Sequence, residues 1–236
     1  MVISIPPAPP WFTEQLARYA QEAGIKLHSD QLELLKHHAE WVFFWNRVTN
    51  LTAARDWNEL ITKHYLDALI AAYKWLPKSG TMLDIGSGAG FPGIPIKILS
   101  PDLDVTLCEV RRKKASFLKS FIYHAGLTKI RVEQATWQEV LLKAKDKFDL
   151  ITWRAIKIGF KDILEIIDRG VAKGGIVACW TTPSSIKKGD FPLRWPAEKS
   201  INSAEEIYGS MAVNSSVFFY SLPGGVERAL VLFSRE

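Results

Sequence analysis

The sequence predicts an α/β fold in which helices cover both faces of a mostly parallel sheet, with a helical extension in front of it. Strand-like and helix-like segments alternate from residue 78 onward, and such alternation is typical of parallel sheets. A glycine-rich stretch, residues 81–95, lies at the first strand-to-helix junction. Two apolar runs flank Pro223-Gly224-Gly225 and predict a closing antiparallel hairpin.

The first 77 residues have a helical pattern. Residues 1–10 are too rich in proline for a helix and form a leader. Helical periodicity then predicts three helices, with Ser29 as the expected N-cap of the second. These helices span residues 11–23, 31–45 and 57–75. We therefore expect a leader and helical extension over residues 1–77 and an α/β domain over residues 78–236.

Strands and helices alternate through the rest of the chain. The strand-like runs are Met82–Ile85, Val105–Glu109, Ile130–Gln134, Phe148–Trp153, Ile176–Thr181, Val217–Leu222 and Ala229–Ser234. The helix-like segments are Ile94–Leu99, Lys113–Ala125, Trp137–Lys143 and Lys161–Val171. We expect seven strands, of which the last are antiparallel.

The chain has 236 residues, of which 47% are hydrophobic and 23% are charged, so it is long and apolar enough to bury a substantial core. The net charge of +5 is compatible with a polyanionic partner but does not establish one. Cys108 and Cys179 each lie in an apolar run, so we expect core residues rather than a disulfide or a metal site. No apolar run approaches about 20 residues and no signal-peptide pattern is present, so we expect a cytoplasmic protein.

The glycine-rich stretch predicts a nucleotide cofactor site, because glycines let a backbone turn tightly and approach a ligand. Starting at Gly88, it satisfies the G-x-G-x-x-G pattern of dinucleotide sites. Starting at Asp84, it reads D-x-G-x-G-x-G, the pattern of S-adenosylmethionine-dependent methyltransferases. Pro92 and Pro95 remove N–H donors that a pyrophosphate would need at the helix start, which favours the second interpretation.

Two carboxylates are further candidates for cofactor contacts. Glu109 ends the next strand, where it can accept hydrogen bonds from both ribose hydroxyls of a nucleoside. The alternative is a surface glutamate paired with Arg111 or Arg112. For Asp84 the alternative to a cofactor contact is a residue that caps the glycine loop.

Four segments together resemble the small-subunit ribosomal RNA guanine-N7 methyltransferase family, also called the glucose-inhibited division protein B family. They are LDIGSGAGFPGIP, the upstream NRVTNLTAARDWNELITKHYLDAL, the downstream CEVRRKKASFL, and Trp153-Arg154-Ala155. The resemblance covers residues 41–175 and, more loosely, the tail LPGGVERALVLFSRE.

The resemblance implies a Rossmann-like class I methyltransferase fold and a monomeric cytoplasmic enzyme without a metal. Such an enzyme transfers a methyl group from S-adenosylmethionine to N7 of a guanine in 16S RNA, either as free RNA or within the 30S subunit. Guanine N7 carries an exposed lone pair, so the reaction needs positioning and no general base. The alternatives are a methyltransferase for a different acceptor and a non-catalytic RNA-binding or ribosome-assembly module.

Several site residues follow from matching the family motifs. Arg154 is the expected catalytic residue, at the cofactor or at the target base. The expected cofactor-binding residues are Asp84, Gly86, Gly88, Phe91, Glu109, Thr136, Trp137 and Arg154. Trp137 departs from the family, which has a carboxylate there, and Cys179–Pro183 departs from an Ala-Leu-Lys-Gly segment. These two departures leave the acceptor less certain than the cofactor.

Basic residues near the carboxyl ends of the strands are the expected contacts to RNA phosphates. They are Arg47, Arg55, Lys63, His64, Arg111 and Arg112. The alternative for the arginine pair is an ordinary solvated helix start, and for His64 a packed hydrogen-bonding residue. Trp153 and Trp180 lie at strand ends, where we expect an indole that could stack on a base.

Overall fold

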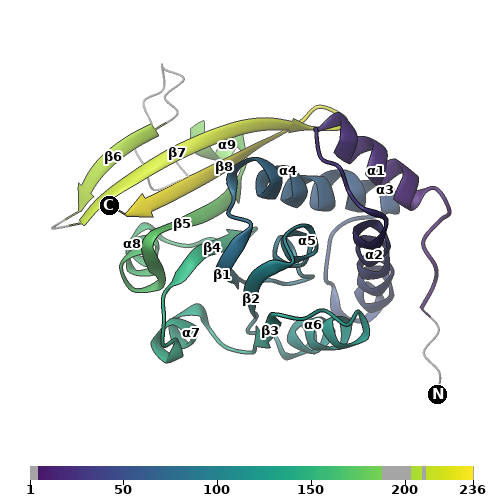
Figure 1. Ribbon diagram of the computed structural model, residues 1–236, viewed down its shortest axis with the longest axis horizontal. Helices are drawn as coiled ribbons and strands as arrows, with labels where there is room; N and C mark the ends of the chain where they lie inside the picture. The colour runs from purple at the N-terminus through teal and green to yellow at the C-terminus, as the bar shows by residue number, and fades with distance from the viewer. Residues whose placement is uncertain (1–4, 188–202, 209–210, 236) are drawn as a thin grey trace.

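The computed structural model describes residues 5–187, 203–208 and 211–235 and contains one sheet of eight strands, in the order β3-β2-β1-β4-β5-β8-β7-β6 (Figure 1). The strands are β1 (Ser79–Ile85), β2 (Asp102–Cys108), β3 (Ile130–Glu133), β4 (Phe148–Arg154), β5 (Val171–Thr181), β6 (Ser203–Tyr208), β7 (Met211–Leu222) and β8 (Val226–Arg235). All seven predicted strands are present. The eighth, β6, pairs with β7 at the edge of the sheet and was not predicted.

The pairing confirms the expected Rossmann-like arrangement. Strands β3, β2, β1, β4 and β5 are parallel, whereas β8 runs antiparallel to β5 and β7 runs antiparallel to β8. The carboxyl ends of the parallel strands therefore meet at one edge. At this edge lie Cys108, Ile85, Arg154 and Thr181, and Ala229 of β8 pairs with Thr181 there.

Helices cover both faces of the sheet, and successive strand residues point to opposite cores. The helices are α1 (Phe12–Glu22), α2 (Ser29–Thr49), α3 (Trp57–Leu60), α4 (Leu66–Trp75), α5 (Gly93–Leu99), α6 (Arg112–His124), α7 (Trp137–Lys143), α8 (Phe160–Glu165) and α9 (Pro183–Lys187). Met82 packs in the core with α1, α2, α4, α5 and α6, whereas the next residue, Leu83, packs in the core with α7 and α8. This alternation follows from the two-residue period of a strand.

The helical extension shares its core with the sheet, since Phe12 of α1 and Leu107 of β2 belong to one buried cluster. The stacking of Trp75 on Phe218, with ring centroids 4.9 Å apart, joins the end of α4 to β7. The division of the chain between residues 77 and 78 stays a prediction. Among the described residues, no helix is long and apolar enough to cross a membrane.

The second and third helical segments differ in detail from prediction. The N-cap of α2 is His28 rather than Ser29, and the Gln31 side chain accepts a hydrogen bond from the His28 backbone N–H at 3.0 Å. The third predicted helix contains a π-helical turn, η1 (Ile61–Tyr65), between α3 and α4. A second π-turn, η2 (Ile166–Gly170), follows α8. Periodicity does not reveal such turns because they insert one residue without changing composition.

The glycine loop between β1 and α5 is packed tightly on its inner side. Gly90 has a positive φ of 85°, and a Cβ there would lie 2.9 Å from Ile94 Cγ1 and 3.2 Å from His38 Nε2. A Cβ at Gly93 would lie 2.5 Å from Leu107 Cδ2. Gly90 is therefore required by packing and by backbone conformation together, whereas Gly93 is required by packing alone.

We predict that Gly90→Ala destabilises the protein by about 3 kcal/mol, because a positive φ and a steric clash add to one another. Gly126→Ala is the matched control, since its φ is 62° but nothing lies within 4 Å of the new Cβ. The control should lose only about 1 kcal/mol. Urea unfolding monitored by tryptophan fluorescence measures both, and equal losses would contradict the packing argument.

Candidate functional site

The glycine loop has an open outer side. Gly86 and Gly88 have positive φ values of 69° and 56°, and a Cβ at Gly88 would lie 3.9 Å from Lys114 Nζ. The backbone N–H groups of Gly86 and Ser87 both donate to Cys108 O, at 2.8 and 3.1 Å, which ties the loop to the end of β2. A ligand could therefore approach the backbone at Gly88. A Cβ at Gly86 would lie 3.1 Å from Ile156 Cγ2, so the Ile156 side chain covers that position, and Gly90 and Gly93 face inward.

Glu109 lies directly after β2 and is held by backbone groups. Its Oε2 accepts the Gly88 N–H at 2.9 Å and its Oε1 accepts the Arg111 N–H at 2.8 Å. Only 5% of the residue is exposed, so it is not the surface glutamate of the alternative interpretation. A carboxylate has about four lone-pair positions, so acceptor capacity remains for two hydroxyl donors. The remaining acceptor positions of Glu109 fit the two ribose hydroxyls of a nucleoside cofactor.

Asp84 lies beneath the loop and is fully buried. Its Oδ1 accepts the Thr152 hydroxyl at 2.9 Å, whereas Oδ2 has no hydrogen-bond partner among the described residues. Burial raises the pKa of Asp84 to about 6, although the hydrogen bonds from Ser87 and Thr152 oppose this rise. The position supports a role in holding the loop, and a direct contact with a cofactor stays a prediction.

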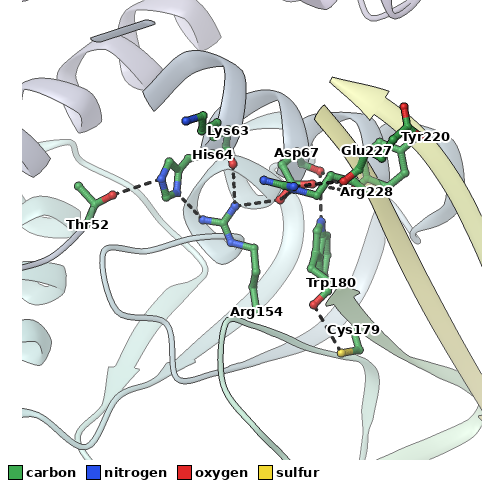
Figure 2. A network of polar contacts seen from close by, with 10 residues as sticks. All are labelled: Thr52, Lys63, His64, Asp67, Arg154, Cys179, Trp180, Tyr220, Glu227 and Arg228. Carbon is green, nitrogen blue, oxygen red and sulfur yellow. Dashed lines mark hydrogen bonds and ion pairs between the residues drawn. The ribbon is translucent and has the colours of Figure 1, made fainter. Parts of the chain in front are cut away.

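Arg154, at the end of β4, lies in a network of polar contacts (Figure 2). Its Nη1 donates to Asp67 Oδ2 at 3.1 Å and to Lys63 O at 3.3 Å, and its Nη2 donates to His64 Nδ1 at 2.7 Å. The guanidinium carbon lies 5.3 Å from the centre of the Phe91 ring. Arg154 therefore forms an ion pair inside the protein, and its acid is Asp67 on α4.

His64 belongs to this network as an acceptor. Arginine can only donate, so His64 Nδ1 must carry the lone pair, and Nε2–H then donates to the Thr52 hydroxyl at 3.2 Å. Burial and the nearby Arg154 and Arg228 guanidiniums lower the pKa of His64 to about 3. The side chain is therefore a neutral, packed hydrogen-bonding residue, in agreement with the alternative given for it.

Phe91 is 5% exposed and lies among aromatic side chains of the helical extension. Its ring centre lies 5.2 Å from that of His38 and 5.1 Å from those of His64 and Tyr65. His38 Nε2 donates to Ala89 O at 2.9 Å, which fastens α2 to the glycine loop. In this arrangement Phe91 supports the loop from behind, and its contact with a cofactor stays a prediction.

Thr136 and Trp137 lie after β3, at the edge where Glu109 lies. Thr136 is the N-cap of α7, accepting the Glu139 N–H at 3.3 Å, and its own backbone N–H donates to Glu139 Oε2 at 2.8 Å. Trp137 is half-buried against the core beside α7 and α8. Trp137, where the family resemblance implies a carboxylate, is therefore a packing residue.

The predicted RNA contacts divide into two groups. Arg47, Arg55, Arg111 and Arg112 are exposed. Lys63 Nζ instead donates to Glu59 Oε1 at 2.7 Å. His64 lies inside the polar network and presents no charge to RNA. Arg111 precedes α6 as its N-cap, so the arginine pair occupies a helix start at the sheet edge that carries Glu109.

The tryptophan expectation is wrong, because Trp153 is 2% and Trp180 5% exposed. Trp180 Nε1 donates to Asp67 O at 3.2 Å, so its indole is part of the protein interior and does not face a base. The cysteine expectation is confirmed, since both are buried. Burial raises the pKa of Cys108 to about 12 and also raises that of Cys179, so neither is a ready nucleophile.

Sequence reasoning missed the acid and two partners at the centre of the network. Asp67 Oδ1 accepts the Tyr220 hydroxyl at 2.6 Å, and Asp67 Oδ2 lies 3.7 Å from Arg228 Nε. The available signal was a single acid within an otherwise apolar stretch, LDALIAA. In the described part of the chain, no group of three or more His, Cys, Asp and Glu residues could hold a metal ion.

We predict that Asp84 lowers the stability of the protein as the pH rises from about 4 to about 6. The raised pKa means that the folded state keeps a proton that the unfolded state releases, so stability falls across this window and is constant above it. Asp84→Asn cannot titrate. The difference in free energy of unfolding between Asp84→Asn and the unaltered protein should therefore grow by roughly 3 kcal/mol across the window. A pH-independent difference would contradict the assignment.

Comparison with solved structures supports the fold alone. The chain is similar to a putative O-methyltransferase from Klebsiella pneumoniae, with a TM-score of 0.56, 13% identity, and coverage of 94% of this chain and 96% of that one. It is also similar to precorrin-6Y C5,15-methyltransferase from Geobacter metallireducens, with a TM-score of 0.52, 16% identity, and coverage of 79% and 95%.

Comparison with curated sequences shows the family. Ribosomal RNA small subunit methyltransferase G 1 of Syntrophobacter fumaroxidans is 34% identical, over 71% of this chain and 77% of that protein. Ribosomal RNA small subunit methyltransferase G of Roseiflexus castenholzii is 37% identical, over 61% of this chain and 62% of that protein. The family model described as rRNA small subunit methyltransferase G matches residues 31–182, which include the glycine loop, Asp67 and Arg154. The chain belongs to this methyltransferase family, whose methyl donor is S-adenosylmethionine.

Proposed function

We propose that the protein transfers a methyl group from S-adenosylmethionine to N7 of a guanine in small-subunit (16S) ribosomal RNA. The observation that carries this proposal is the match to the family over residues 31–182, together with a buried Glu109 beside an open glycine loop. When bound, S-adenosylmethionine supplies an electrophilic methyl group on its sulfonium. The protein then has to bind the cofactor, orient the base and exclude water.

The cofactor would lie along the carboxyl edge of β1, β2 and β3. Glu109 would accept both ribose hydroxyls, and the backbone at Gly86 and Gly88 would lie against the cofactor. Thr136 and Trp137 follow β3 at this edge and would border the adenine by backbone and apolar contacts. Asp84 and Phe91 would act from behind the loop, since both are buried.

The residues around Arg154 suit an acceptor that needs no general base. His64 is neutral, and its lone pair already accepts a hydrogen bond from Arg154. Both cysteine thiols stay protonated near neutral pH, so attack by a thiolate is disfavoured. Guanine N7 attacks with its own lone pair and requires neither group. The arrangement therefore supports positioning as the main source of catalysis.

Arg154 would supply the positioning. A guanidinium has five N–H donors, of which three are used by Lys63 O, Asp67 and His64. Nε–H and one Nη2–H have no partner within the described ranges. These parallel donors can bind guanine O6 or the carboxylate of the cofactor, while N7 stays free to react.

RNA would be held by the exposed arginines Arg47, Arg55, Arg111 and Arg112, through phosphate contacts that carry no sequence information. We propose that the 30S subunit or its RNA is the partner, that the protein acts as a monomer, and that it works in the cytoplasm where ribosomal subunits are assembled. Trp180 bears on the alternative of a different acceptor. Its indole N–H donates to Asp67 O, so this departure from the family changes the packing beneath the site and places no side chain against the acceptor.

We predict that small-subunit RNA from cells with the gene contains one N7-methylguanine that is missing when the gene is deleted. Mass-spectrometric mapping of RNA fragments measures this directly. Purified protein and S-adenosylmethionine should restore the modification on subunits from the deletion strain. An unchanged pattern of N7-methylguanine would exclude the proposed acceptor. Absence of any cofactor binding in a calorimetric titration would leave only a non-catalytic RNA-binding module.

We predict that Glu109→Gln weakens S-adenosylmethionine binding by at least about tenfold, because a neutral amide is a poorer acceptor for two hydroxyls. Glu133→Gln is the matched control. Glu133 is exposed at the end of the neighbouring strand β3 and should be replaceable without effect. Isothermal titration calorimetry gives the dissociation constants. Equal affinity of both variants for the cofactor would show that Glu109 does not bind the ribose.

A further inference from the structure

Asp67 gathers side chains from four strands that follow it in the chain (Figure 2). It lies in α4 and is 2% exposed. Arg154 of β4 and Arg228 of β8 approach its carboxylate, Tyr220 of β7 donates to it, and Trp180 of β5 donates to its backbone oxygen. Among the described residues, Asp67 forms no hydrogen bond or ion pair with the glycine loop or with Glu109, so it has no direct part in the cofactor contacts proposed above.

The two carboxylate oxygens have different partners. Oδ1 accepts the Tyr220 hydroxyl at 2.6 Å, whereas Oδ2 lies 3.1 Å from Arg154 Nη1 and 3.7 Å from Arg228 Nε. The single carboxylate of Asp67 therefore forms ion pairs with two guanidiniums, which would repel one another without its negative charge. The cluster keeps a net positive charge at the edge of the sheet where the parallel strands end.

Asp67 also fixes the orientation of Arg154. Asp67 and Lys63 O accept from Nη1 and His64 accepts from Nη2, so three hydrogen bonds restrain the orientation of the planar guanidinium. The side edge formed by Nε–H and Nη2–H is left for a ligand. Without the Asp67 charge, Nη1 would lose one of its two acceptors. The guanidinium would then be held less firmly in the orientation that leaves Nε–H and Nη2–H for a ligand.

We propose that Asp67 is a positioning residue of the methyl-transfer site. It holds the Arg154 guanidinium in the orientation that presents its free edge to the reacting base and cofactor, and it keeps Arg228 beside it. The inference rests on the proposed function for its activity readout. A positioning role requires that the effects of Asp67 and Arg154 substitutions on methyl transfer depend on one another. A purely structural ion pair does not require this.

A double-mutant cycle in methyl transfer to small subunits tests this inference. Asp67→Asn should lower kcat/KM on the order of 30-fold, as expected when a charge-assisted hydrogen bond that orients the arginine is lost. Arg154→Met should lower it at least as much, and the double variant should be no slower than Arg154→Met alone. Multiplicative losses, or Asp67→Asn within threefold of the unaltered protein, would overturn the proposal.

Tyr220→Phe is the control within the network, because it removes the hydroxyl contacts to Asp67 Oδ1 and to the Asp67 backbone oxygen and alters neither arginine. It should stay within about threefold of the unaltered protein in transfer. A loss equal to that of Asp67→Asn would indicate general disruption of the cluster and would overturn the proposal.

Asp67→Asn leaves two partly buried guanidiniums without a counter-charge and could unfold the protein. The variant Asp67→Asn with Arg228→Met avoids this, since its cluster has the same net charge as the unaltered one. It should be on the order of 30-fold slower than Arg228→Met alone. Equal rates for these two variants would overturn the proposal.

A spectroscopic readout separates failure of this inference from failure of the proposed function. In histidine-labelled protein, the ¹⁵N shift of His64 Nδ1 reports its hydrogen bond from Arg154, and a His64→Gln variant assigns the signal. The resonance should be shifted in Asp67→Asn or, if that variant does not fold, in Asp67→Asn with Arg228→Met. This shift should occur in the absence of any RNA or cofactor. An unchanged resonance would refute positioning by Asp67, whereas a shifted one with no transfer by the unaltered protein would refute only the methylation of small subunits.

Discussion

The interaction on which the site depends is the buried pairing of Asp67 with Arg154, because it joins the helical extension to the end of the central strand β4. Such a pair gains little net free energy, since both charges must leave water, but breaking it would leave an uncompensated charge inside the protein. Tyr220, Trp180 and Arg228 bring β7, β5 and β8 to the same point. The relative placement of helices and sheet is thus specified by polar contacts as well as by the shared apolar core.

A second connection between the extension and the sheet passes through the glycine loop. His38 on α2 donates to Ala89 O, and the Phe91 ring lies among His38, His64 and Tyr65. Burial lowers the pKa of His38 to about 3, so this contact persists over the whole physiological range of pH. The glycine loop is therefore supported on its inner side by the N-terminal helices.

The strands, most helices and the glycine loop could be predicted because they depend on local patterns. Asp84, the glycines and Glu109 are close in sequence to the strand ends that place them. The polar network around Asp67 could not be predicted in the same way, because Asp67, Arg154 and Arg228 are brought together only by tertiary packing. Trp180 shows the same limit, since a tryptophan at a strand end is exposed or buried according to what packs over it. The edge strand β6 has no alternating apolar pattern of the kind that identified the others.

The π-helical turn η1 sets which side chains the following helix directs at β4. One inserted residue rotates α4 by roughly 100° relative to the direction it would have in an uninterrupted α-helix. Lys63 O and His64 lie within this turn, and Asp67 follows it, so all three Arg154 partners depend on the extra residue. The number of residues in this turn therefore determines which nitrogens of the Arg154 guanidinium are hydrogen-bonded within the protein and which are left free.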